Sequence, residues 1–280
     1  MGMLNNITKE VFEANVPAAK MPERNSSVFD RLEKMLSVAY ETMIRTIVSP
    51  DCEASIDDDS ELYTLCQRMV CLDAFVRTCR SLDLVLTATG FGIVSTESTA
   101  PASKVRVDAL IEEMACERLA VLDKMLPMLA AIDGWGATAQ ASLQMPTLFC
   151  HPQDLRQYTT LPFSSQNWQT AKGRAVTADA LLRQEISDEY MDELLAKTRT
   201  STLTNADIIV VEKCNRFTGD FLSHYDVTKG LPNVVMLRLI VHQLESYRDS
   251  YPTYCNSKLY ARRHAERYKN QKEDPSFFFM

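Results

Sequence analysis

The sequence predicts a mainly α-helical protein built from two helical bundles. Three observations predict this fold class. Glycine is scarce, with 8 glycines among 280 residues, and residues that favour helix are common. Apolar residues recur every three or four positions over long stretches, which places them on one face of a helix. Residues that cap helices, together with prolines and glycines, stand between those stretches.

Three long helices are predicted in the first half. The first carries an apolar stripe over residues 29–47. The second carries one over residues 62–79, and we expect it to stop at Gly90. The third carries one over residues 107–122, and we expect Pro127 to end or kink it because proline lacks the backbone N–H that a helix needs.

The helical pattern weakens at residues 138–166, where three prolines interrupt it. We expect an irregular connecting segment here, with residues 147–150 in a short strand of a β-hairpin. Periodicity returns at residues 167–186 and again around residues 191–195.

The remaining helices are predicted from their first residues. Thr204 and Asp207 have the spacing of a capping box, in which each side chain accepts from the other's backbone N–H. Pro232 is expected at the first position of the next helix. A last, basic helix is predicted over residues 256–270.

These elements group into four parts. An N-terminal arm covers residues 1–25, and a first bundle covers residues 26–137 with an inserted loop at residues 90–103. The connecting segment covers residues 138–166. A second bundle with a basic C-terminal helix and an aromatic tail covers residues 167–280.

The two bundles also have the pattern of an internal duplication. Shifting the first apolar stripe by 139 residues places six apolar residues in register, which are Trp168, Ala171, Ala175, Ala178, Leu182 and Ile186. Because any two amphipathic helices can be brought into register, chance similarity stays the alternative.

Composition excludes several classes of protein. The net charge of −7 disfavours a general nucleic-acid binder, because binding phosphates requires a basic surface. No apolar run approaches the 18 residues of a membrane-spanning helix. No secretory signal precedes the eight cysteines, so we expect free thiols and synthesis in a reducing cytoplasm.

Catalytic and metal-binding motifs are not found in the sequence. There is no Walker loop, no GxSxG elbow, no HExxH pair and no CxxC zinc spacing. Cys150 and His151 form the one adjacent thiol–imidazole pair, with Asp154 close by. We expect no enzyme, no cofactor and no metal, and a helical enzyme with a site at these three residues is an alternative.

Charge is distributed unevenly along the chain. Residues 51–61 hold six acids and no base, for a local charge of −6. Residues 257–272 have a local charge of +5, from one acid and six bases, namely Lys258, Arg262, Arg263, Arg267, Lys269 and Lys272. One interpretation is two solvated faces, and another is that the two segments meet across subunits of a ring. The basic helix could instead contact DNA in a channel without reading its sequence.

The sequence then finishes with Phe277, Phe278 and Phe279 before Met280. Three consecutive aromatic side chains are costly to leave in water. We therefore expect them to dock on the protein's own core or in a groove of a neighbouring subunit.

Two stretches in the first half carry a resemblance to a known family. Residues 82–95 include Gly90, Phe91 and Gly92, and residues 99–108 read Thr-Ala-Pro-Ala-Ser-Lys-Val-Arg-Val-Asp. With a looser likeness from residue 147 onward, the chain resembles uncharacterised head–tail connector proteins of phages and prophages of gut anaerobes. The resemblance implies a structural protein of the virion neck, made in the host bacterial cytoplasm, with no catalytic residues to carry over.

The resemblance also implies partners. Such a protein would form a homododecameric ring between the portal and tail or neck proteins, with DNA passing through the ring and no membrane contact. The loop at Gly90, Phe91 and Gly92 and both termini would contact neighbours. The alternatives are another virion component, such as a tail-completion or minor capsid protein, and a non-viral helical interaction or scaffold protein.

Overall fold

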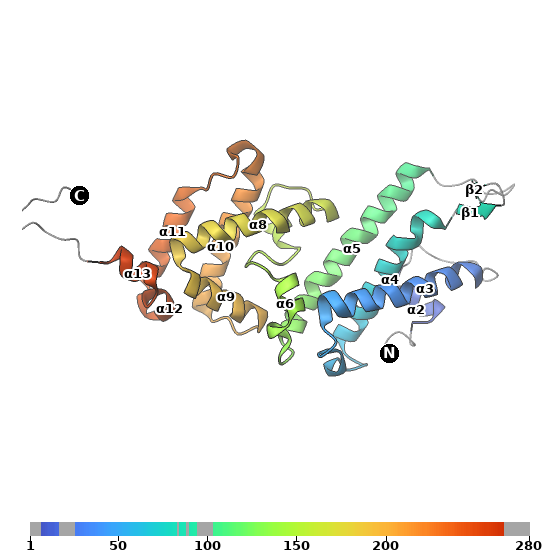
Figure 1. The fold of residues 1–280 in the computed structure, drawn as a ribbon, viewed down its shortest axis with the longest axis horizontal. Coiled ribbons are helices and arrows are strands. Elements are labelled where there is room, and N and C mark those ends of the chain that lie inside the picture. Colours follow the sequence, from blue (N-terminus) through green and yellow to red (C-terminus); the bar gives the residue numbers. More distant parts are fainter. Residues whose placement is uncertain (1–6, 17–25, 83, 88–89, 94–102, 266–280) are drawn as a thin grey trace, which may run out of the picture.

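The structure, a computed structural model, describes residues 7–16, 26–82, 84–87, 90–93 and 103–265. Within these residues the fold is helical apart from one two-stranded hairpin, which confirms the predicted mainly α class. The helices form two groups that lie side by side along the long axis of the molecule (Figure 1).

The first group contains three long helices, named α3, α4 and α5, and α4 packs against both α3 and α5. A short helix, a π-helical turn and a β-hairpin complete it. The bounds are α2 Lys9–Asn15, α3 Ser26–Met43, the π-helix Ile44–Val48, α4 Glu61–Thr78, β1 Leu84–Thr87, β2 Gly90–Ile93 and α5 Lys104–Ala130.

The second group contains α8, α10 and α11, which contact one another, and α9, which packs against α8 and α12. Two short helices, α6 and α7, precede it. The bounds are α6 Ala139–Gln144, α7 Asp154–Tyr158, α8 Ser165–Ile186, α9 Asp188–Arg199, α10 Asn205–Thr228, α11 Val234–Ser246, α12 Pro252–Cys255 and α13 Lys258–Arg263.

Each group has its own hydrophobic core. The apolar stripe of α3 packs with those of α4 and α5 in the first core, which also includes Trp135. The apolar stripes of α8, α10 and α11 form the second. The connecting segment contributes to both, because Cys150 lies in the first core and Phe149 in the second. The two groups are thus joined by a packed segment.

Several helix ends follow the sequence prediction. The capping box of α10 is present, with the Thr204 side chain accepting from Asp207 N–H and the Asp207 side chain accepting from Thr204 N–H. The helix predicted over residues 167–186 is α8, which Ser164 caps by accepting from Asn167 N–H.

The predicted hairpin in the connecting segment is wrong. Residues 147–150 are buried but form no strand, and among the described residues backbone pairing into a sheet joins only β1 and β2. The hairpin lies in the first half instead, where β1 and β2 pair antiparallel from Leu84↔Ile93 to Thr87↔Gly90. Consequently α4 ends at Thr78 and does not continue to Gly90.

Three further boundaries differ from the prediction. Helix α5 does not end at Pro127, one of the two outcomes expected there, but continues to Ala130, because the buried residues of that last turn hold it in place. Helix α11 begins at Val234, since the Asn233 side chain caps it by accepting from Met236 N–H, and Pro232 lies before the cap. The predicted arm contains α2, whose Phe12 is fully buried in the first core.

The predicted basic helix over residues 256–270 is also wrong in its extent. Ser257 starts a new helix by accepting from Tyr260 N–H, so α12 and α13 are separate, and α13 ends at Arg263. The rest of the basic segment lies outside the described residues.

Candidate interaction surfaces

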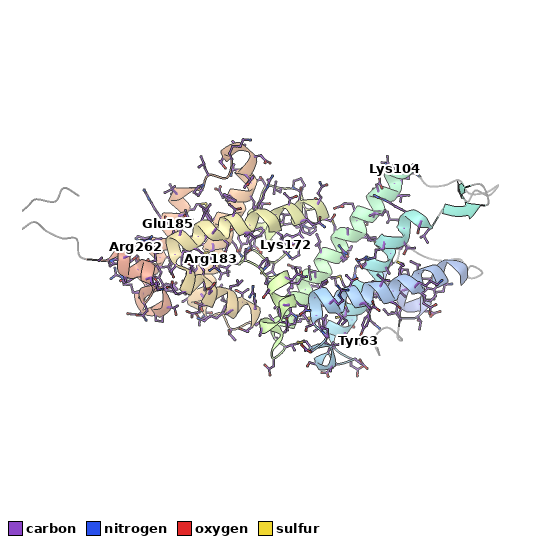
Figure 2. All side chains as sticks on the ribbon, viewed as in Figure 1. Tyr63, Lys104, Lys172, Arg183, Glu185 and Arg262 are labelled. Atoms are coloured by element: carbon purple, nitrogen blue, oxygen red, sulfur yellow. The ribbon has the colours of Figure 1, made fainter. Side chains whose placement is uncertain are left out.

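The basic helix α13 lies at the end of the second helix group that is farther from the first group (Figure 1). Lys258 and Arg262 on this helix are exposed. Arg263 is bound to the end of α8, where its guanidinium donates to the Glu185 carboxylate at 3.0 Å and to the Glu185 carbonyl at 3.1 Å. Figure 2 shows Arg262 and Glu185 together at this end of the molecule. The fold therefore fixes part of the predicted basic surface in place.

A groove of about 750 Å³ separates α13 from the start of α9. Lys258 and Arg262 line one side of it, and acidic residues of α9 line the other. Arg183 of α8 also lines the groove and is held by Asp179 at 2.6 Å and Asp192 at 2.7 Å. Of the acidic residues in this lining, Asp188 and Asp192 are already paired with Arg183, and Glu185 is paired with Arg263.

The acidic segment at residues 51–61 lies in the first helix group, between the π-helix and α4. Asp57, Asp58 and Asp59 are exposed, whereas Glu53 accepts a hydrogen bond from the Tyr40 hydroxyl. Ser60 follows the three acids and caps α4 by accepting from Tyr63 N–H. Most of the acidic charge is therefore presented to solvent within one subunit, and it lies well away from α13 in Figure 1.

Gly90, Phe91 and Gly92 lie in β2, and Phe91 is opposite Leu86 of β1. Figure 1 shows this hairpin at the end of the first group, opposite to the end that carries α13. The other predicted contact residues lie outside the described part of the chain, namely Arg267, Lys269, Lys272, Phe277, Phe278 and Phe279.

Cys150, His151 and Asp154 lie where the two groups join. The Asp154 carboxylate accepts from His151 N–H at 3.0 Å, and His151 Nδ1 lies 3.5 Å from the Asp123 carboxylate of α5. The Cys150 thiol is buried in the first core, and burial raises its pKa, so it stays protonated. The imidazole therefore bonds a carboxylate, and the thiol is not an activated nucleophile.

The titration of this cluster has clear physical causes. Burial raises the pKa of Asp154 to about 6, although the His151 charge and backbone N–H bonds oppose that rise. Burial would lower the pKa of His151, but the hydrogen bond to Asp123 and the charges of both carboxylates outweigh it and raise the pKa. The cluster is a charged link between α5 and the start of α7.

Two polar networks were not predicted from the sequence. Asp73 of α4 is buried and binds Arg77 at 2.6 Å and also Arg118 of α5. Asp207 binds Lys197 at 2.9 Å and the Tyr190 hydroxyl at 3.2 Å. The four-residue spacing of Asp73 and Arg77 indicates an ion pair from the sequence alone. No sequence spacing indicates the partners that come from other helices, which are Arg118, Lys197 and Tyr190.

No group of three or more His, Cys, Asp or Glu side chains suited to a metal ion occurs among the described residues. In the same part of the chain, no helix has both the length and the apolar character to cross a membrane.

Part of the chain matches a known protein family. Residues 29–142 match a family of unknown function, DUF6712. This range covers less than half of the chain, from α3 through α6. It includes the hairpin with Gly90, Phe91 and Gly92. Searches of curated proteins and of solved structures found no significant match.

Proposed function

We propose that this protein is a structural subunit of a ring-shaped head–tail connector in a phage or prophage virion. The proposal extends the family resemblance of residues 82–95 and 99–108. One structural observation supports it most: the hairpin at residues 84–93 and the basic helix α13 lie at opposite ends of one elongated subunit (Figure 1). Different contact surfaces at two ends suit head-to-tail association, which closes into a ring when the rotation between neighbours permits.

The charge distribution supports the same arrangement. The acidic residues 51–61 and the exposed Lys258 and Arg262 are too far apart to meet within one subunit (Figure 1). Between subunits, they would attract each other and help to set the register of neighbours. The match to a family of unknown function neither supports nor opposes this role.

The copy number in virions tests the proposal. Intact particles of the encoding phage would be purified and digested, and this protein would be quantified against the portal protein by mass spectrometry. We expect parity with the portal or a small integer multiple of it. Absence from particles would overturn the connector role, and a ratio without integer relation would favour another virion component.

Charge reversal tests the contact between subunits. The double variant Lys258→Glu and Arg262→Glu should reduce incorporation into particles about tenfold, a loss equivalent to about 1.4 kcal/mol. Adding Asp57→Lys and Asp58→Lys should restore incorporation if the two segments meet. Lys124→Glu, an exposed cation of α5 outside both segments, is the matched control. An equal loss in the control, or no restoration, would contradict the contact.

A further inference from the structure

A crevice of about 250 Å³ lies where α3, α4 and α5 of the first group meet α8 of the second. Its lining includes seven buried apolar side chains, which are Ala39, Met43, Ile47, Met69, Leu119, Leu122 and Trp168. An engineered apolar cavity of about 150 Å³ binds benzene, so this crevice has room for one aromatic ring. Methionine side chains adapt their shape to an inserted ring and interact favourably with it.

On the α8 side of the crevice, the lining carries a positive charge from Lys172. Lys172 of α8 donates to the Leu143 carbonyl at 3.2 Å, and no carboxylate pairs with it among the described residues. Burial lowers the pKa of Lys172, which shows that its ammonium group is partly removed from water. Figure 2 shows Lys172 between the two helix groups. The other cation, Arg118, is already bound to Asp73, so Lys172 is the better site for an incoming acid.

These features define the chemistry of an occupant. An aromatic ring would bury its faces against the methionine, leucine and tryptophan side chains. An acidic group near that ring would pair with Lys172. This pair would be stronger than one on an open surface because its surroundings are partly desolvated.

One segment of the chain has both features. Residues 273–280 read Glu-Asp-Pro-Ser-Phe-Phe-Phe-Met, with two acids followed closely by three aromatic residues. The last described helix, α13, is bound to the C-terminal end of α8 through Arg263 and Glu185, whereas Lys172 lies in the N-terminal half of α8. We propose that residues 273–280 of one subunit bind in the crevice of a neighbouring subunit, with a phenylalanine ring in the apolar part and an acid at Lys172. This inference rests on the proposed ring, and it names a second contact between neighbours beside the charge contact proposed above.

A peptide assay tests the crevice directly. The host would be the full chain with Phe277, Phe278 and Phe279 each replaced by Ser, so that its own segment does not compete. The probe would be a fluorescein-labelled peptide of residues 273–280, with binding followed by fluorescence anisotropy. We expect saturable binding that weakens about tenfold or more with Lys172→Glu, because charge reversal removes the pairing and adds repulsion.

Controls assign the binding to the crevice. Lys124→Glu should leave the affinity unchanged, and Thr42→Phe, which places a ring in the crevice, should weaken it. A peptide with Ser at the three Phe positions should not bind. The proposal is overturned if the peptide does not bind, if the Ser peptide binds equally well, or if neither crevice variant changes the affinity.

A mixing experiment tests whether the neighbour supplies the segment. The Ser-substituted host keeps an intact crevice, whereas the Lys172→Glu variant keeps an intact segment. In a mixture, the segment of the Lys172→Glu variant can enter the crevice of the Ser-substituted host, whereas neither variant can make this contact with itself. We therefore expect analytical ultracentrifugation to detect a mixed complex that neither variant forms alone. Failure to associate would overturn binding between neighbours. The virion copy number tests the connector role independently, so failure of the peptide assay would leave that role standing.

Discussion

The two helix groups fill their cores with different side chains. The first core is rich in sulfur, with Met43, Met69, Met125, Cys66 and Cys71 all buried. The second is rich in aromatic rings, which include Phe149, Trp168, Tyr190, Phe217, Phe221, Tyr251 and Tyr254. Thioether and thiol side chains adapt to irregular spaces, whereas rings pack in a few preferred geometries. The comparison teaches that one helical pattern can enclose a sulfur-rich core and an aromatic-rich core, and we expect the sulfur-rich core to adapt more readily to a change of side chain.

The buried polar networks of the two groups also differ in the helices that they join. In the first group, buried Asp73 of α4 pairs with Arg77 of the same helix and with Arg118 of α5, so the pair with Arg118 links the two helices. In the second, Asp207 joins the capping box of α10 to two residues of α9, Lys197 and Tyr190. The crevice lies where the sulfur-rich core of the first group meets α8 of the second group.

Truncation of one core residue in each group should have the largest effect. Phe217→Ala should cost about 3–5 kcal/mol, because Phe217 is fully buried and stacks on Phe221 at 6.3 Å between ring centroids. Met125→Ala, at an equally buried position, should cost about 2–4 kcal/mol, since neighbouring sulfur-containing side chains relax into the space.

The two tryptophans allow the unfolding of each helix group to be followed separately. Trp135 lies in the first core and Trp168 in the second, so the variants Trp135→Phe and Trp168→Phe each leave a reporter for one group. Urea unfolding would be followed by fluorescence in each background. If Met125→Ala lowered the free energy of unfolding more than Phe217→Ala, the expectation that the sulfur-rich core adapts more readily would be contradicted.

Loss of a helix cap should have an intermediate effect. Thr204→Ala removes the side chain that accepts from Asp207 N–H, and it should lower the free energy of unfolding by about 1 kcal/mol. Thr170→Ala, an exposed position on α8 whose hydroxyl bonds only within its own helix, is the matched control and should have little effect. Thermal unfolding measured by circular dichroism would compare them. Equal losses in both variants would mean that the capping box contributes nothing specific.

The stability should also depend on pH, with opposite signs in two places. Burial opposes the ionisation of Asp207, but its bonds from Lys197 and Thr204 hold its pKa below the usual value. Its contribution to stability is therefore present at neutral pH and lost as the pH falls through the lowered pKa. Asp154 and His151 have raised pKa values, so their contributions are present in acid and lost as the pH rises.

Asp154→Asn should isolate the second of these contributions. It should flatten the loss of stability of the wild-type protein between about pH 4 and 6, the window set by the ordinary and raised pKa values of Asp154. Urea midpoints measured across this range would show the change. A slope identical to that of the wild-type protein would mean that the cluster does not couple protonation to folding.

The helices of the long apolar stripes were predictable because their evidence is local. The stripe at residues 29–47 and the pair Thr204 and Asp207 each depend on contacts within about one or two helical turns. The ends of α4 and α5 were not predictable, because backbone pairing of residues 84–93 ended one helix and core burial extended the other past Pro127. Likewise, no local sequence pattern indicates that Lys172, Met69 and Leu122 line one crevice.

The sequence by itself determined the helical class, the absence of recognisable catalytic motifs and the uneven distribution of charge. These follow from composition and from spacing that repeats over a few residues. Only the tertiary structure decided that residues 147–150 form no strand, that Asp73 joins Arg118, and that α13 and the hairpin lie at opposite ends of the molecule. Contacts between distant residues depend on how whole helices pack, and packing is set by the three-dimensional fit of many side chains at once.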